Sequence, residues 1–284
     1  MHSLSFKRLL LISRPRIWIY TAGSFLLGIF YSQSFNIPTS HILVSFPTWK
    51  IIYTVFWLTI PANIFLYALN DAYDTGTDED NPKKDGFEIK ADSSDKKTLL
   101  VISLISVLLY LPIIFSLDLI AQTIFLIWIL IVVTYNVPPL RFKMRPIVDN
   151  LFALNFPLWG VFGYYLIQGN LPTNFTLAMI AVFATVMHIY TASGDIEFDR
   201  RDGIYTTAVL IGSIKKTLLV CLLLTAILMC GLWIQGLPEL SIAMSLYFIY
   251  FLYQLSSKIS PHILYKYYIY LHYIVGFVYF SLKL

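Results

Sequence analysis

Long stretches without a charged residue constrain the fold of this chain more than any other feature of its sequence. Asp, Glu, Lys and Arg are absent from residues 17–49, 51–70, 98–117, 119–140, 150–194, 217–238, 240–257 and 267–282. An α-helix needs about 20 predominantly apolar residues to cross the hydrocarbon core of a bilayer. Only 13% of the residues are charged, whereas a soluble domain carries about 25%. The chain is therefore predicted to be an all-α, polytopic membrane protein, with residues 1–284 forming a single integral-membrane domain.

The charge-free stretches predict nine transmembrane helices in one bundle. Residues 150–194 are long enough for two crossings, and QGNLPTN at 168–174 supplies the turn between them through Gly, Pro and Asn. The predicted helices are 17–34, 50–72, 97–117, 119–136, 148–168, 175–194, 214–235, 239–256 and 262–282.

The distribution of basic residues predicts the orientation, because cytoplasmic loops carry an excess of Lys and Arg. With the N-terminus in the cytoplasm, all of the 20 Lys and Arg residues except Lys50 and Lys283 fall on the inside. Three inside loops, 73–96, 137–147 and 195–213, are also long and ionic. We therefore expect a protein of the cell membrane with a polar cavity that faces the cytoplasm.

The loop after the second predicted helix opens with closely spaced oxygen ligands, in LNDAYDTGTDED at 69–80. Asn70, Asp74 and Asp78 are four residues apart, and each step of four residues turns only about 40° around an α-helix. If the helix continues past its apolar run, these side chains form one stripe.

A second acidic segment, DIEFDRRDG at 195–203, begins where the sixth predicted helix reaches the same side of the membrane. Asp195 and Asp199 are again four residues apart. Stacked carboxylates repel one another, but divalent cations between them make the arrangement stable, and oxygen ligands without His or Cys suit Mg²⁺. Two such segments facing one another would form a receptor for a diphosphate. The predicted metal ligands are Asn70, Asp74, Asp78, Asp195 and Asp199.

The loop TYNVPPLRFKMRP at 134–146 is the basic counterpart of the acidic segments. Its two consecutive prolines prevent a helix, and cations on a stiff turn can bind phosphate oxygens, Arg in bidentate fashion. The predicted diphosphate ligands are Arg141, Lys143 and Arg145; anchoring by the positive-inside rule is the alternative. Tyr135 lies just inside the membrane edge, where it either contacts the diphosphate or belongs to the aromatic belt.

The two acidic segments and the basic loop resemble the UbiA superfamily of intramembrane prenyltransferases. The family's first motif, Asn-Asp-x-x-Asp-x-x-x-Asp, is matched by Asn70, Asp71, Asp74 and Asp78, and its second, Asp-x-x-x-Asp, by Asp195 and Asp199. YNVPPLRFKMR resembles the family's Tyr-x-x-Pro-Pro-x-Arg-x-Lys segment. The resemblance covers nearly the whole chain. It implies an Mg²⁺-dependent enzyme that transfers a prenyl group from an allylic prenyl diphosphate, and the residues expected to carry the reaction are Asp74, Asp195, Tyr135 and Lys143.

Within that family, SRPRIWIYTAG at 13–23 and MHIYTASGDIEFDRRDGIYTTAVLIG at 187–212 resemble the lycopene elongase branch, which prenylates the ends of carotenoids. Gly194 and Phe198 stand where that branch tends to have Pro, and Asp202 lies one residue before the place of a further family Asp. The resemblance implies a lipophilic acceptor, an acyclic carotenoid such as lycopene.

Further side chains are candidates for the acceptor side of the cavity. His188 lies seven residues before Asp195, two helical turns deeper on about the same face; a packing histidine is the alternative. Arg14 and Arg16 lie just before the first helix; the family resemblance implies that either can reach the acceptor side, and an interfacial anchor is the alternative. Pro61 and Asn63 predict a bend in the second helix that opens the cavity.

Other functions are open at this stage. Within the family, an aromatic acceptor in quinone, tocopherol-like or haem-side-chain biosynthesis competes with the carotenoid, although no dedicated cation for an aromatic acid is visible between the loops. A membrane transporter would place ionisable residues near the midplane, whereas these stretches are charge-free. The Asp-Gly-x-x-Ala-Arg run of CDP-alcohol phosphotransferases is absent. Donor, acceptor and membrane lipids are the expected partners, and nucleic acid is not.

Overall fold

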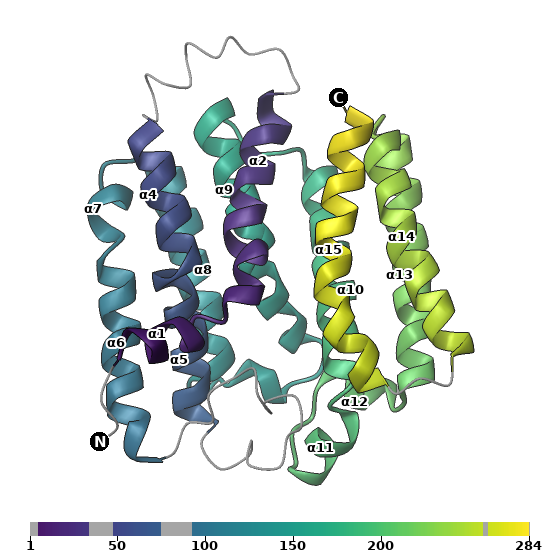
Figure 1. Cartoon of the computed structure of the whole chain (residues 1–284), viewed down its shortest axis with the longest axis horizontal. Helices are drawn as coiled ribbons and strands as arrows, with labels where there is room; N and C mark the ends of the chain where they lie inside the picture. Colours follow the sequence, from purple (N-terminus) through teal and green to yellow (C-terminus); the bar gives the residue numbers. More distant parts are fainter. Residues whose placement is uncertain (1–4, 34–47, 75–92, 258–260, 284) are drawn as a thin grey trace. The chain divides into compact units, whose positions relative to one another are not determined.

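The computed structural model describes residues 5–33, 48–74, 93–257 and 261–283, and within these ranges it contains helices and no β-strand. The all-α prediction is therefore confirmed for the described residues. The chain divides into two compact units (Figure 1), and the single domain stays a prediction. Unit 1 comprises Met1–Arg141 and Asn155–Pro172, and unit 2 comprises Phe142–Leu154 and Thr173–Leu284.

The helices of each unit follow the apolar stretches of the sequence. Those of unit 1 are α1 (Phe6–Ile12), α2 (Ser24–Gln33), α4 (Thr48–Thr59), α5 (Pro61–Tyr73), α6 (Lys96–Leu108), α7 (Leu111–Ile114), α8 (Leu119–Asn136) and α9 (Pro157–Gln168). Those of unit 2 are α10 (Asn174–Ser193), α11 (Ile196–Arg201), α12 (Thr207–Ile211), α13 (Ile214–Ile234), α14 (Pro238–Ser256) and α15 (Pro261–Lys283).

Several of these helices are suited to a bilayer by length and composition. Among the described residues the membrane-spanning candidates are Thr48–Tyr73, Lys96–Ile114, Leu119–Asn136, Asn174–Ser193 and Ile214–Ile234. The chain is thus a multi-pass membrane protein. Each predicted range contains a helix, but the count of nine crossings stays a prediction.

Two of the predicted helix ranges are partly wrong. Val148–Asn155 is a 3₁₀ helix, and the α-helix of the 148–168 range begins only at Pro157, because proline is favoured in the first turn and not inside a helix. The 12 residues of α9 extend about 18 Å, less than the roughly 30 Å of the hydrocarbon core. The 17–34 range is α-helical only from Ser24, after a π-helix over Ile19–Gly23.

The predicted bend at Pro61 is a break between α4 and α5. Proline has no N–H and interrupts the helical hydrogen bonds here. Asn63 compensates, since its Nδ2 donates to the carbonyl oxygens of Leu58 at 2.6 Å and Thr59 at 3.0 Å. Thr21 adds a 2.8 Å bond to Leu58 O. Side chains therefore donate to the carbonyls just before the break, where Leu58, Asn63 and Thr21 are fully buried.

The core of unit 1 is a cluster of aromatic rings from α4, α8, α9 and the turn after α6. The ring centroids of Trp57 and Tyr110 are 4.4 Å apart, and those of Trp128 and Trp159 are 5.1 Å apart. Trp57 Nε1 donates to Ser106 O at 2.7 Å. The cluster buries large apolar area and fixes these helices against one another.

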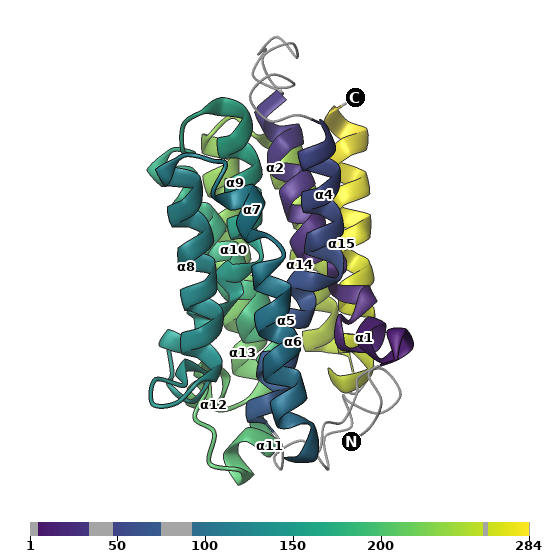
Figure 2. The ribbon, with the colours of Figure 1, turned by 90° about the vertical axis from the view of Figure 1, so that its left-hand side faces the viewer.

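Helix α1 lies crosswise to the long helices of unit 1 (Figures 1 and 2). Ser5 caps its N-terminus through a 3.2 Å bond from the Arg8 backbone N–H. Ile12 packs against Ile64 and Leu99 in a buried cluster with α5 and α6, whereas Phe6 is exposed. An apolar residue on the outside of a crosswise helix is typical of a segment at the membrane surface.

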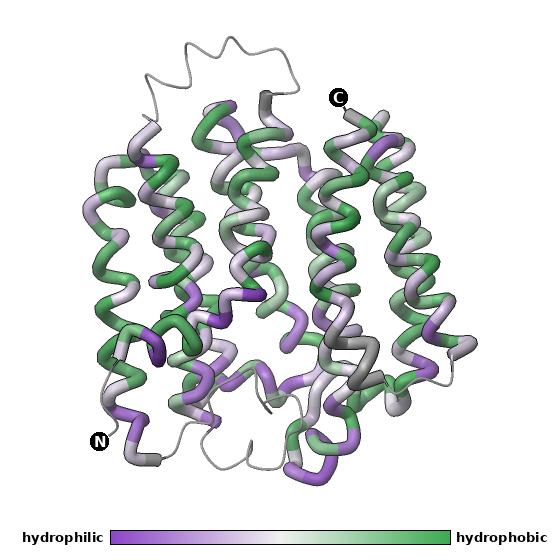
Figure 3. The backbone as a smooth tube through the Cα atoms, in the orientation of Figure 1, coloured by the Kyte–Doolittle hydropathy of each residue, from purple (hydrophilic) through white to green (hydrophobic). Residues whose placement is uncertain are grey.

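Unit 2 packs α10 against α13, α13 against α14, and α14 against α15. Tyr190 lies at the centre of its core, with its ring centroid 4.2 Å from that of Tyr268 and 5.1 Å from that of Phe251. Gln254 donates to the Tyr190 hydroxyl. Hydrophobic residues run along these helices, and hydrophilic residues gather around α11 (Figure 3).

Helices α2 and α9 approach closely because glycine stands at their contact. A Cβ added at Gly28 would lie 2.0 Å from Gly160 O, and one at Gly163 would lie 2.4 Å from Phe25 O. Small residues let membrane helices pack backbone to backbone. The 2.7 Å bond from Gln168 Nε2 to Ser32 O links the same two helices.

We predict that Gly28→Ala destabilises the protein by roughly 1–3 kcal/mol, because the new methyl group collides with a backbone carbonyl that cannot rotate away. Thermal unfolding of the detergent-solubilised protein measures the effect. Gly276→Ala is the matched control, since a Cβ there meets open space and alanine favours the helix. An unfolding midpoint as high for Gly28→Ala as for Gly276→Ala would contradict the close contact.

Candidate active site

The first acidic motif stands at the C-terminal end of α5 in unit 1. The helix ends at Tyr73 and Asp74 is its C-cap residue, so Asn70 and Asp74 lie about one helical turn apart. Asp78 lies outside the described residues. The C-terminus of a helix carries partial negative charge, which makes a carboxylate there unfavourable unless a cation is close.

Arg141 supplies such a cation. Its Nη2 lies 3.5 Å from Asp74 Oδ1 and donates to Tyr73 O at 3.2 Å. The residue has a left-handed backbone with φ of 38° and follows the Pro138–Pro139 turn. Its Nε is buried and has no hydrogen-bond partner among the described residues. A buried N–H without an acceptor is costly, so this atom suits an incoming oxyanion.

Asp71, between the two predicted ligands, is engaged elsewhere. Its Oδ1 lies 3.1 Å from Arg14 Nη2, and both side chains are largely buried. The Arg14 guanidinium also lies over the Tyr67 ring, 4.1 Å from its centroid. Asp71 is one residue from Asn70, about 100° around the helix, which already separates it from the Asn70–Asp74 stripe. Arg14, a residue predicted for the acceptor side of the cavity, thus neutralises Asp71 in the structure.

Asn136 is a buried neighbour of Asn70 that sequence reasoning missed. It is the last residue of α8, directly after the predicted Tyr135, and its Oδ1 accepts from Asn70 Nδ2 at 2.9 Å. The sequence signal for it is an amide at the C-terminal end of a helix without charged residues.

The second acidic motif lies in unit 2, at the start of α11. Asp195 is the N-cap residue of this helix, and the 2.7 Å bond from Asp199 N to Asp195 O places the two aspartates one turn apart. Both are partly exposed. A helix N-terminus favours a carboxylate, in contrast to the position of Asp74. Asp202, at the other end of α11, accepts from Arg201 Nε at 2.9 Å.

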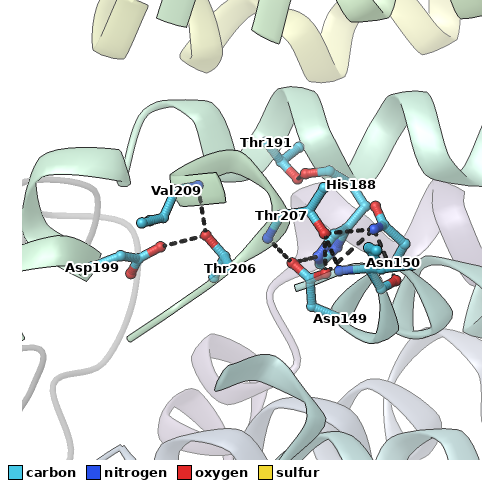
Figure 4. Close-up of polar contacts among 9 residues, drawn as sticks. Asp149, Asn150, His188, Thr191, Asp199, Thr206, Thr207 and Val209 are labelled. Carbon is cyan, nitrogen blue, oxygen red and sulfur yellow. Dashed lines mark hydrogen bonds and ion pairs between the residues drawn. The ribbon is translucent and has the colours of Figure 1, made fainter. Parts of the chain in front are cut away.

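Asp199 is also held from the following segment. Thr206 Oγ1 donates to Asp199 Oδ2 at 3.4 Å and accepts from Val209 N at 3.3 Å, which makes Thr206 the N-cap of α12 (Figure 4). The backbone N–H of Ile204 donates to Asp199 O at 2.8 Å. The segment that follows α11 therefore bonds back to Asp199 of the second motif.

A buried polar network around Asp149 fixes that loop to the 3₁₀ segment of unit 2 (Figure 4). Asp149 is fully buried and accepts from Thr207 N at 2.8 Å and from the Thr207 hydroxyl. The Thr207 hydroxyl accepts from Asn150 Nδ2 at 2.8 Å and from Ile147 N at 2.7 Å. His188 Nε2 lies 3.4 Å from Asp149 Oδ2. Neither Asp149 nor this network was predicted from the sequence.

The ionisation of Asp149 reflects these contacts. Burial raises the pKa of its carboxyl, but the hydrogen bond and charge of His188 and the hydrogen bonds of Thr207 lower the pKa by more, so that it lies below that of an ordinary aspartate. Asp149 is therefore an anion at neutral pH. The contact of His188 with this anion fits the packing histidine that the sequence offered as the alternative, although its partner was not predicted, and the role toward the acceptor stays a prediction.

The predicted diphosphate ligands divide between the two units. Arg141 ends the first segment of unit 1, whereas Lys143 and Arg145 belong to unit 2. Lys143 is buried in a short 3₁₀ helix, and Arg145 lies over the Phe142 ring at 6.0 Å from its centroid. Tyr135 is in α8 of unit 1.

The described residues fit Mg²⁺ by the chemistry of their donors. Each motif offers two oxygen-bearing side chains one turn apart, without His or Cys, as hard divalent cations prefer. Among these residues no group of three His, Cys, Asp or Glu side chains gathers around one point. The candidate oxygen ligands among the described residues therefore form two pairs, one in each unit.

Comparisons with known proteins agree with the motifs. Residues 43–255 match the model of the UbiA prenyltransferase family. Proteins named lycopene elongase/hydratase from Haloarcula japonica and Halobacterium salinarum are each 35% identical to this chain, over 206 and 208 residues. The alignments cover 72% and 73% of this chain and 67% and 72% of the relatives.

Solved structures share the fold. A UbiA homologue from Archaeoglobus fulgidus bound to DMAPP and Mg²⁺ gives a TM-score of 0.66 at 19% identity, covering 96% of this chain and 98% of that chain. The same homologue bound to GPP and Mg²⁺ gives a TM-score of 0.63, also at 19% identity, with 96% of each chain covered.

We predict that Asp149→Asn lowers the free energy of unfolding by roughly 2–4 kcal/mol, because an amide cannot accept from Thr207 twice while facing His188. Denaturant unfolding of the solubilised protein measures this. Asp202→Asn is the matched control: its pair with Arg201 is partly exposed, and loss of such a pair costs at most about 1 kcal/mol. Equal stability of the two variants would show that the Asp149 network does not hold unit 2 together.

Proposed function

Because the chain belongs to the UbiA prenyltransferase family, we propose that it transfers a prenyl group from an allylic prenyl diphosphate to an acyclic carotenoid such as lycopene. The observation that carries the choice of acceptor is the 35% identity to proteins named lycopene elongase/hydratase. The two acidic motifs and the basic turn support the donor, since they supply oxygen ligands for cations and N–H donors for phosphate.

The proposed metal ligands are the residues of the two motifs. Asn70 and Asp74 form one pair and Asp195 and Asp199 the other, with Asp78 as a further ligand of the first motif. Mg²⁺ bound to these oxygens would neutralise the diphosphate and act as a Lewis acid on the leaving group.

Basic side chains complete the proposed diphosphate site. Arg141 has a buried Nε–H that lacks an acceptor among the described residues, and this donor can bind a phosphate oxygen. Lys143 and Arg145 add positive charge, which stabilises the leaving group as its negative charge grows. Tyr135, from the helix that precedes the basic turn, is proposed to contact the same group.

The proposed reaction breaks the C–O bond between the allylic carbon and the diphosphate, and the electron pair leaves with the diphosphate oxygen. The terminal alkene of the acceptor supplies the pair for the new C–C bond, which moves the positive charge onto the acceptor. Loss of a proton, or addition of water followed by loss of its proton, ends the reaction. Apolar helices keep bulk water from the allylic cation, and His188 and Arg14 are proposed for the acceptor side.

The orientation is part of the proposal. All basic residues but Lys50 and Lys283 fall on one side of the predicted topology, which supports a cytoplasmic N-terminus and a cytoplasmic site in the cell membrane. A soluble prenyl diphosphate would reach the polar motifs from the cytoplasm, and a carotenoid would reach them from the bilayer.

We expect Asp74→Ala and Asp195→Ala each to reduce prenyl transfer by a factor of about 10² or more, because each removes a proposed metal ligand. Transfer of a labelled allylic diphosphate in isolated membranes measures this. Asp202→Ala is the control in the same loop and should keep a rate within a few-fold of the unmodified protein. Full turnover by either ligand variant would refute the metal assignment, as would wild-type activity that survives EDTA.

We predict that expression in a lycopene-producing bacterium with a supply of allylic diphosphate yields carotenoids heavier than lycopene by a prenyl unit, with or without added water. Mass spectrometry of the extracted pigments detects them. The Asp74→Ala variant should leave lycopene unchanged. If the active protein also left the pigment unchanged while it prenylated an aromatic acceptor in membranes, the carotenoid assignment would be wrong and the family assignment would stand.

A further inference from the structure

A pair of amides joins the first acidic motif to α8 within unit 1. Asn136 is fully buried. Its Nδ2 donates to Val132 O, four residues earlier in the same helix, at 2.8 Å. Its Oδ1 accepts from Asn70 Nδ2 at 2.9 Å. The two bonds use both ends of the Asn136 amide.

The chemistry of these contacts fixes which atom of each amide points where. A backbone carbonyl can only accept, so the atom of Asn136 that faces Val132 O must be the NH₂ group. Its Oδ1 therefore faces Asn70. Because Oδ1 is also only an acceptor, Asn70 must present its own NH₂ group to Asn136. The remaining atom of the Asn70 amide is Oδ1, the atom that can bind a cation.

We propose that Asn136 is a positioning residue that presents Asn70 Oδ1 to Mg²⁺. The inference rests on the proposed function, since it takes Asn70 as a metal ligand. A flipped Asn70 would place two oxygen acceptors 2.9 Å apart in a buried site and turn NH₂ toward the cation. The amide pair excludes that state before the metal binds, in the way that outer groups orient the ligands of metal sites in general.

Asn136 lies beside the basic turn and not in either acidic motif. Asn136 follows Tyr135 and precedes the Val137-Pro138-Pro139 run. The last side chain of α8 thus hydrogen-bonds to α5 at Asn70, one turn before Asp74. An amide suits the position, because it offers a donor to Val132 O and an acceptor to Asn70 at once.

The test is a metal titration of Asn136→Ala, which removes the acceptor and lets the Asn70 amide rotate. Mn²⁺ binding to the solubilised protein, followed by electron paramagnetic resonance without any diphosphate, gives the dissociation constant directly. The Mg²⁺ concentration for half-maximal transfer gives a second value. Both should rise about 10-fold or more, while the rate at saturating Mg²⁺ changes less.

The matched control is Asn63→Leu. Asn63 is also a buried amide of α5, but it bonds to backbone carbonyls at the Pro61 break. Its loss should lower the thermal unfolding midpoint and leave both metal values unchanged. Asn136→Leu is the second variant, which decides the question if Asn136→Ala does not fold: it keeps the side-chain volume but offers no acceptor to Asn70, so both metal values should rise.

A double variant separates action through Asn70 from any other effect. In an Asn70→Ala background, adding Asn136→Ala should not weaken metal binding further. An equal weakening in both backgrounds, or no weakening by Asn136→Ala or Asn136→Leu in the unmodified background, would overturn the inference. If Asn70→Ala itself left Mn²⁺ binding unchanged, the metal assignment in the proposed function would fail instead.

Discussion

The requirement that every backbone polar group in an apolar environment has a partner governs this molecule. It explains why the described chain is helical, and also how a helix can be interrupted inside it. At Pro61 the helix is interrupted, and Asn63 and Thr21 supply donors to the carbonyls of Leu58 and Thr59 just before the break. The break makes α5 a helix of its own, with the first acidic motif at its end. An apolar residue at position 63 would remove the side-chain donor to Thr59 O and leave Leu58 O with Thr21 alone, which lowers the stability of the break.

The two acidic motifs have opposite relations to their helices. Asp74 caps the C-terminus of α5, where the helix dipole repels a carboxylate, whereas Asp195 caps the N-terminus of α11, where it attracts one. The first motif therefore depends on external positive charge, which Arg141 supplies in part at 3.5 Å. At the second motif the helix terminus favours the carboxylate, and Thr206 and, through Thr207, Asp149 hold the segment that follows it.

Spacing along the chain predicted the features that depend on local geometry. The apolar ranges contain the helices, the break falls at Pro61, and Asn70–Asp74 and Asp195–Asp199 are each one turn apart. Spacing could not predict which distant side chains meet. Asp71 sits in the middle of a metal-binding pattern, yet its carboxylate pairs with Arg14, which is 57 positions away in the sequence. Asp149 lay near the start of the range 148–168 assigned to a membrane helix, because the charge-free stretch that predicted this helix begins at residue 150. Only the packing of its segment against α10 and α12 reveals the network.

The amide at position 70 illustrates why one neutral side chain is suited to an otherwise acidic motif. An aspartate there would add a second carboxylate one turn from Asp74, at a helix end that already disfavours negative charge. It would also accept where Asn70 now donates, so Asn136 would have to reverse its amide and turn an oxygen toward Val132 O. That reversal would place two acceptors against each other in a buried site, which costs more than the original bond contributed. An asparagine avoids both penalties and still offers one oxygen. The identity of the residue at 70 is thus set jointly by the end of its own helix and by the end of α8.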